Sequence, residues 1–168
     1  TRTERKGAPA TIRGGTQNVQ QLGTRKTIKV NAVAYLMTVY NLDYMALTET
    51  GLAQTDLNSI EHTFRKKGMH FYGSADDTSQ ASGSGTGQGV AFVLSNRFFL
   101  ETVGRGGRPP ATVDPGRIMS MRLRSKAASE HTIFAVYGKA DPNKPDSNAK
   151  ARAIAKQLQQ SVKDALKA

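Results

Sequence analysis

The chain has 168 residues, which suits one domain or part of a larger one. Its 24 lysines and arginines against 13 aspartates and glutamates give a formal net charge of +11. It has no cysteine, which excludes disulfides and cysteine-ligated zinc, and no apolar run long enough to predict a membrane span. The positive excess favours a polyanionic partner, DNA or RNA, over a membrane surface, because no helical stretch combines an apolar face with a dense basic face. A basic surface that serves only solubility is the alternative.

The chain is predicted to begin with an arm and a short strand. Residues 1–9 are polar and basic and are expected to form a flexible arm ahead of one domain over 10–168. A first strand is expected within 10–19, running into a turn at Gly14 and Gly15.

Helices and strands are predicted to alternate over the next fifty residues. Apolar residues three and four apart predict a helix over 25–40, and an apolar run predicts a buried strand over 44–47. A second helix, capped by Thr55 or Asp56, is expected before a strand over 69–72. The residues expected on the buried faces of the two helices are Val30, Val33, Ala34, Met37, Tyr40, Leu57, Ile60 and Phe64.

Strands joined by loops are predicted for the second half of the chain. The Gly- and Ser-rich segment 73–89 and the Gly- and Pro-rich segment 103–116 are expected to be loops around an apolar strand, 90–94. Alternating apolar and polar residues over 118–124 predict a half-buried strand, and 132–137 predicts the last strand.

A C-terminal helix completes the predicted elements. It is expected over 146–167, capped by Asp146 or Ser147, with Ile154, Leu158, Val162 and Leu166 on one face. Early strands connected through helices and later strands connected by loops predict an α+β fold, with a mixed β-sheet and flanking helices.

Polar residues end the first two predicted strands, Asn18 after one and Glu49 after the other. The ends of neighbouring strands in such a unit line one crevice, where ligands bind. A carboxylate that ends a buried strand is costly unless a positive group meets it, and Mg²⁺ prefers one or two carboxylates with several waters. The alternative is that Glu49 only caps the next turn or pairs with a basic residue.

Five segments, taken in chain order, resemble one known group of proteins. They are Gly15–Gly23 (GTQNVQQLG), Leu42–Leu52 (LDYMALTETGL), Gly87–Ser95 (GQGVAFVLS), Gly116–Leu123 (GRIMSMRL) and Ile133–Asn143 (IFAVYGKADPN). Together they are similar to the opening of the endonuclease/exonuclease/phosphatase superfamily, which includes DNase I, the apurinic endonucleases and the endonucleases of LINE-type retrotransposons. The sequence is most similar to the retrotransposon branch of this superfamily. The resemblance implies the N-terminal portion of a DNase I-like four-layer α/β sandwich.

The resemblance also implies roles for matched positions. Asn18 matches an asparagine that orients the scissile phosphate, Glu49 a carboxylate that binds a divalent metal (Mg²⁺ or Mn²⁺), and Tyr137 a tyrosine that lies near the phosphate. Gln20 matches a position that is aspartate, asparagine or glutamine in relatives, and is a candidate for contact with nucleic acid.

Other candidates rest on charge or residue type alone. Arg105, Arg108 and Arg117 could contact a phosphate backbone, although Arg105 and Arg108 fit a plain solvated loop equally well. Four aromatic residues are expected to pack in the core or on the sheet rather than to stack on bases. These are Tyr35, Tyr40, Phe98 and Phe99.

The catalytic set is predicted to be incomplete. The later Gly-Asp-Phe-Asn-type and Ser-Asp-His-type segments of the family have no match before Ala168, and His62, His70 and His131 are expected to be structural or exposed. The expected function is a metal-dependent endonuclease that nicks DNA, inactive as this chain alone and completed by a missing C-terminal half or a second chain. A non-catalytic basic nucleic-acid-binding or assembly module, and a phosphatase of the same superfamily, are the alternatives.

Overall fold

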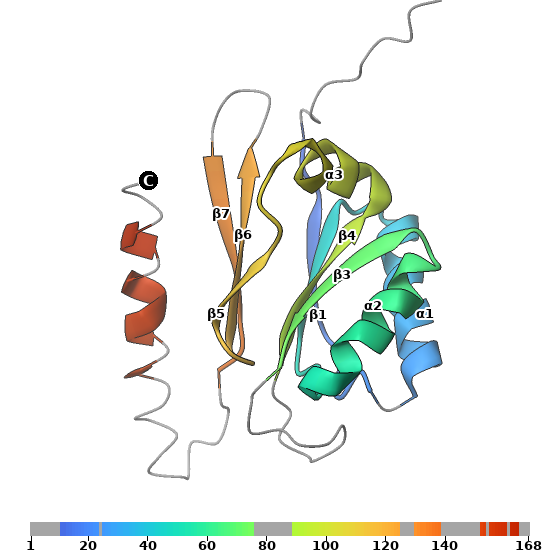
Figure 1. Cartoon of the computed structure of the whole chain (residues 1–168), viewed down its shortest axis with the longest axis horizontal. Coiled ribbons are helices and arrows are strands. Elements are labelled where there is room, and N and C mark those ends of the chain that lie inside the picture. The colour runs from blue at the N-terminus through green and yellow to red at the C-terminus, as the bar shows by residue number, and fades with distance from the viewer. Residues whose placement is uncertain are drawn as a thin grey trace, which may run out of the picture.

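The computed structural model describes residues 11–23, 25–75, 89–124, 130–138, 152–153, 155–160 and 162–164. Two β-sheets pack face to face, and helices cover their outer faces (Figure 1). Within these described stretches, no helix is both long and apolar enough to cross a membrane.

The first sheet has four strands in the order β1-β2-β4-β3. Its strands are β1 (Gly14–Asn18), β2 (Tyr44–Thr48), β3 (Met69–Ser74) and β4 (Val90–Ser95). β1 pairs parallel with β2, while β4 pairs antiparallel with both β2 and β3. The sheet is therefore mixed, as the sequence predicts, and the β1-α1-β2 crossover forms its parallel part.

Two helices cover one face of the first sheet (Figure 1). They are α1 (Lys26–Val39) and α2 (Leu57–Arg65), the latter preceded by a 3₁₀ turn, η1 (Gln54–Asp56). Their inward stripes meet the sheet in a core where Phe64 stacks on Phe71 with ring centroids 5.4 Å apart. Phe64 is completely buried, which contributes about 2–3 kcal/mol to folding.

The second sheet is antiparallel, in the order β5-β6-β7. Its strands are β5 (Ala111–Asp114), β6 (Ile118–Arg124) and β7 (Glu130–Val136). Met119, Met121 and Leu123 are buried against the first sheet, so the predicted alternation of β6 is confirmed. Helical stretches within 152–164 lie beside its outer face (Figure 1), where the Gln157 side-chain amide donates to the Val113 carbonyl at 3.4 Å.

The predicted turn at Gly14 and Gly15 is wrong, because both glycines lie inside β1. A Cβ on Gly14 would stand 2.0 Å from Cζ of Tyr44, so the glycine makes room for that ring. The glycines mark a close approach of two strands and not a chain reversal.

The predicted loop over 103–116 is also wrong, because it contains a 3₁₀ turn, η2 (Val103–Arg105), and the strand β5. The helix α3 (Asn96–Glu101) has no counterpart in the sequence prediction. It begins where the Ser95 hydroxyl accepts a hydrogen bond from the Phe98 N–H, which is an ordinary N-cap. A helix of six residues is too short to show a periodic apolar pattern, so its N-cap alone does not predict it from the sequence.

Two aromatic residues, one in α1 and one at its C-cap, contradict the packing prediction. Tyr35 is 67% exposed and Tyr40 is 63% exposed, so neither lies on the buried face. Phe98 is buried, as expected, and Phe99 is half-buried and stacks on His70. At the start of α2, the Asp56 side chain makes no capping hydrogen bond, and none is made by Thr55, which lies within η1.

Several predictions lie wholly or partly outside the described residues. The arm 1–9 does, as do residues 76–88 of the predicted loop over 73–89. Gly73 and Ser74 of that segment belong to β3 and not to a loop. Residues 146–151, 154, 161 and 165–167 of the predicted C-terminal helix, with its proposed caps, lie outside as well.

Asp43 ties together one end of the first sheet. Its carboxylate is 1% exposed, accepts the Arg13 main-chain N–H at 2.9 Å and pairs with the Arg97 guanidinium. Its carbonyl accepts the Ser95 N–H at 2.9 Å. One residue therefore fixes the starts of β1 and β2 and the end of β4.

We predict that Asp43→Ala lowers the free energy of unfolding by about 2–3 kcal/mol, because the partly buried Arg13 N–H loses its charged acceptor. Urea unfolding measures this. Glu61→Ala, which removes an exposed ion pair with Arg65, should cost less than about 1 kcal/mol. Equal losses in the two variants would contradict the role of Asp43.

Candidate active site

The ends of β1 and β2 bring Asn18 and Glu49 side by side. Asn18 stands opposite Thr48 in the parallel pairing, and Glu49 follows Thr48 directly. Paired residues of neighbouring strands point to the same face. Ala46, two residues before Thr48, packs in the core between the two sheets, so Asn18 projects toward the second sheet.

Tyr137 and Arg117 approach the same place from the second sheet. Tyr137 follows β7, its N–H donates to the Arg117 carbonyl at 2.8 Å, and the Arg117 guanidinium carbon stands 5.3 Å from its ring centroid. Burial raises the pKa of the Tyr137 phenol, the negative charge of Glu49 raises it further, and Arg117 opposes the rise. The Glu49 carboxylate thus acts on Tyr137 across the gap between the sheets, and the phenol keeps its proton at neutral pH.

Left-handed backbone occurs in the loops that follow β1 and β2, as it also does at Arg25 and Asn41 beside α1. Glu49 has φ 56°, and the consecutive residues Gln20 and Gln21 have φ 41° and 63°. Each such non-glycine residue costs about 1–2 kcal/mol and persists only where its surroundings hold it. Such strain is typical of functional sites.

The two loops hold each other through main-chain hydrogen bonds. The Gln21 N–H donates to the Glu49 carbonyl at 2.7 Å, and the Leu22 N–H donates to the Thr50 carbonyl at 2.6 Å. The Asn18 side-chain oxygen accepts the Gln20 N–H at 3.1 Å, which fixes its amide. The directions of Asn18 and Glu49 are therefore set by the same small set of bonds.

A further chain of hydrogen bonds ties this end of the first sheet to the second. The N–H of Thr50 donates to the Gly89 carbonyl at 3.2 Å, and the Gly89 N–H donates to the Gly116 carbonyl at 3.0 Å. The Gly116 N–H reaches the buried Ser74 hydroxyl at 3.0 Å. Gly89 has φ 112°, and a Cβ there would stand 2.1 Å from the Thr50 hydroxyl oxygen, so only glycine fits.

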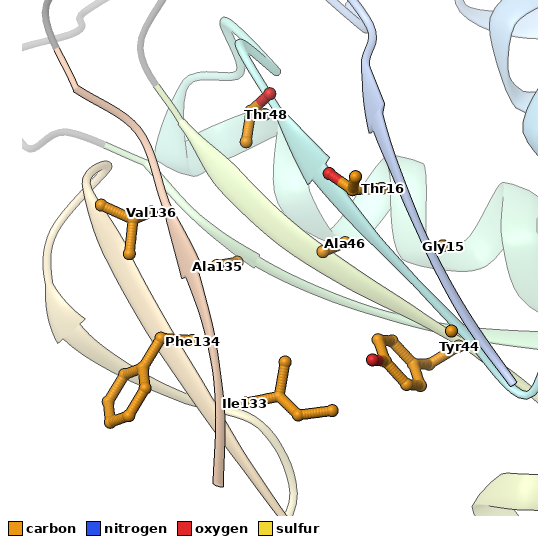
Figure 2. A pocket seen from close by; sticks show the side chains of 10 residues that line it. Gly15, Thr16, Tyr44, Ala46, Thr48, Ile133, Phe134, Ala135 and Val136 are labelled. Carbon is orange, nitrogen blue, oxygen red and sulfur yellow. The ribbon is translucent and has the colours of Figure 1, made fainter. Parts of the chain in front are cut away.

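A cavity of about 480 Å³ opens beside the site, between β1 and β2 of the first sheet and β7 of the second. Figure 2 shows its side chains, among them Thr16, Tyr44, Ala46, Ile133 and Val136. Its lining is largely apolar and includes Thr48, the neighbour of Glu49. The core between the sheets is therefore open along this side.

The other sequence candidates are not all brought to this place. Gln20 lies in the loop after Asn18 and is exposed. Arg105 and Arg108 are exposed too, but Arg105 ends η2, which packs on α3, and α3 begins at the opposite end of β4 from the Thr48 pairing. The structure thus groups Asn18, Gln20, Glu49, Arg117 and Tyr137 and leaves Arg105 away from them.

The histidines do not contribute to the site. His62 and His131 are exposed, and His70 stacks on Phe99 with ring centroids 3.6 Å apart while its Nε2 lies 3.1 Å from the Asn96 side-chain oxygen. This agrees with the expectation that all three are structural or exposed.

The described residues offer a partial fit to a divalent cation. Nowhere in the described part of the chain do three or more His, Asp or Glu side chains cluster so as to hold a metal. Glu49 and Asn18 supply one carboxylate and one amide oxygen, which suits Mg²⁺ because this ion keeps several of its waters. Further ligands would have to be waters, substrate oxygens or groups outside the described residues.

Comparison with known proteins identifies the fold. No family model and no curated protein matches the sequence. The AP endonuclease LMAP from Leishmania major is similar at 20% identity and a TM-score of 0.47, over 74% of this chain and 39% of that one. The APE2 catalytic domain from Xenopus laevis is similar at 18% identity and a TM-score of 0.53, over 86% of this chain and 51% of that one.

The similarity to the APE2 catalytic domain establishes the fold and nothing finer. The chain has a DNase I-like fold, with a mixed sheet and flanking helices, which confirms the predicted fold class. It spans about half the length of the APE2 domain and less of LMAP.

We predict that Glu49→Gln lowers the pKa of Tyr137, because it removes a negative charge that disfavours the phenolate. Ultraviolet titration of each protein against its Tyr137→Phe counterpart isolates this phenol. Glu61→Gln is the control, because Glu61 acts on Tyr72 instead. If the pKa of Tyr137 is unchanged in Glu49→Gln, the carboxylate of Glu49 does not lie close to the phenol of Tyr137.

Proposed function

We propose that this chain is the N-terminal portion of a divalent-metal-dependent endonuclease that nicks DNA, of the kind found in retroelements. The observation that carries the proposal is the convergence of Asn18, Glu49, Arg117 and Tyr137 where β1, β2 and β7 end. The net charge of +11 supports a polyanionic substrate.

Each of these side chains has a role that its chemistry supports. Glu49, with Asn18 beside it, would hold Mg²⁺ or Mn²⁺, which when bound polarises a phosphoryl oxygen. Tyr137 retains its proton and would donate a hydrogen bond to a phosphate oxygen, while the Arg117 guanidinium would offset the charge that develops there. Gln20, in the loop beside Asn18, would contact the nucleic-acid backbone, as would the exposed Arg108 and, away from the site, Arg105.

Hydrolysis also needs a base that deprotonates and aims a water. No histidine among the described residues lies at the site, and Glu49 is committed to the cation. We therefore propose that the general base comes from polypeptide outside these residues, a C-terminal half or a second chain, and that this chain alone does not turn over.

The open side of the two sheets supports that proposal. In the described part of the chain β1 and β7 are edge strands, and both border the cavity of Figure 2. The Arg13 carbonyl and the Val19 N–H form hydrogen bonds with β2. Main-chain groups alternate in direction along a strand, so those of Thr16 point away from the sheet. The Tyr137 N–H donates to the carbonyl of Arg117, directly before β6. By the same alternation, the main-chain N–H and carbonyl of Phe134 point outward from the edge of β7. Added strands could pair with both edges and bury the apolar lining.

We predict that the longer natural protein, given Mg²⁺ and supercoiled plasmid, produces nicks and that Glu49→Ala lowers the nicking rate about 100-fold or more. Glu61→Ala is the matched control, since that carboxylate lies on α2 and pairs with Arg65. Full nicking by Glu49→Ala would refute the assignment.

A second candidate function is a non-catalytic nucleic-acid-binding or assembly module that retains half of a nuclease fold. The single carboxylate of the site and the absence of a nearby histidine among the described residues favour it. It requires salt-sensitive binding of nucleic acid by the longer protein with no cleavage at any Mg²⁺ concentration.

A further inference from the structure

Lys29 lies in the first turns of α1 and reaches the loop that follows β1. Its ammonium donates to the carbonyls of Gln20 and Gln21, at 2.9 Å for Gln21, and the lysine is half-buried there. Charge-assisted hydrogen bonds of this kind are about twice as strong as neutral ones. The helix is thus fastened to the loop by one side chain.

Those two carbonyls belong to the strained residues of the loop. Gln20 and Gln21 are consecutive, non-glycine and left-handed, with φ 41° and 63°. Such a pair persists only where neighbouring groups fix it, and the Lys29 ammonium binds both of its carbonyls at once.

The loop passes this constraint to both candidate metal ligands. The Gln20 N–H donates to the Asn18 side-chain oxygen at 3.1 Å, and the Gln21 N–H donates to the Glu49 carbonyl at 2.7 Å. Glu49 is itself left-handed, with φ 56°, so the direction of its side chain depends on that carbonyl staying in place.

We propose that Lys29 is a positioning residue that fixes the left-handed loop and, through it, orients Asn18 and Glu49 toward a common cation. This inference rests on the proposed metal site but concerns a residue that the proposed reaction does not itself use. Lys29 acts through main-chain carbonyls and touches neither substrate nor cation.

Lys26 provides a matched control on the same helix. It lies one turn earlier on α1, and its ammonium donates to the Ser59 hydroxyl of α2 instead of to the loop. Lys26→Met and Lys29→Met therefore make the same change in charge and size, but only Lys29→Met releases the loop carbonyls.

The test compares Lys29→Met, Lys29→Arg and Lys26→Met in two measurements on the 168-residue chain. The first is amide hydrogen exchange at Gln21 and Leu22, which should accelerate about tenfold in Lys29→Met, with recovery in Lys29→Arg and no change in Lys26→Met. The second is Mn²⁺ affinity, which should fall about tenfold in Lys29→Met and be lost in Glu49→Gln.

Unchanged exchange at Gln21 and Leu22 in Lys29→Met would overturn the inference, whatever the metal does. Faster exchange with undiminished Mn²⁺ affinity would overturn it too, because Lys29 would then stabilise the loop without orienting the metal ligands. A parent chain without Mn²⁺ affinity counts against the proposed function instead, and the exchange data alone then decide whether Lys29 holds the loop. Should Lys29→Met fail to fold, Lys29→Gln, which keeps a neutral N–H donor, takes its place against Lys29→Arg.

Discussion

Two main-chain hydrogen bonds, from Gln21 to Glu49 and from Leu22 to Thr50, hold the candidate site in its present shape. They join two loops whose left-handed residues would relax if either loop were released. Because Thr50 is also bonded to Gly89, the same connection continues into the second sheet. The geometry of the polar side chains is thus set by backbone, which keeps it rigid while the side chains themselves stay partly exposed.

The two ends of the first sheet have different physical roles. At one end, Asp43 is buried and satisfied by Arg13 and Arg97, an arrangement that serves stability. At the other end, Asn18 is exposed and Glu49 is half-buried, which leaves both side chains within reach of a ligand. This division follows the rule for parallel strands, whose carboxyl ends form the crevice where ligands bind.

Patterns within one element could be predicted from the sequence, because burial imposes them directly. The alternation of β6 and the apolar runs of β2 and β4 are of this kind, as is the placement of Asn18 and Glu49 at strand ends. Features that depend on contacts between distant segments could not be predicted. Gly14 looks like a turn residue until the ring of Tyr44 is placed against it, and α3 is too short to show a period.

The residues around the site that could not be predicted also depend on contacts between distant segments. Lys29 is one of several lysines on a basic chain, and nothing in its neighbours along the sequence shows that it binds two carbonyls nine and eight residues away. Gly89 precedes a strand, as many glycines do, and its need for φ 112° follows only from the position of Thr50. Arg117, by contrast, is a candidate from its charge alone, but its position over the Tyr137 ring depends on the pairing of β6 with β7.

The proposed function requires that Asn18 and Glu49 face one crevice and hold a divalent cation there. Paramagnetic broadening of amide signals by Mn²⁺, added to the isotope-labelled chain, tests it most directly because the effect falls steeply with distance from the ion. If the cation binds there, the signals of Gln20, Glu49 and Thr50 broaden first, while those of Asp43 and Ser95 at the far end of the sheet stay sharp. Equal broadening at both ends, or broadening that survives Glu49→Gln, would contradict it.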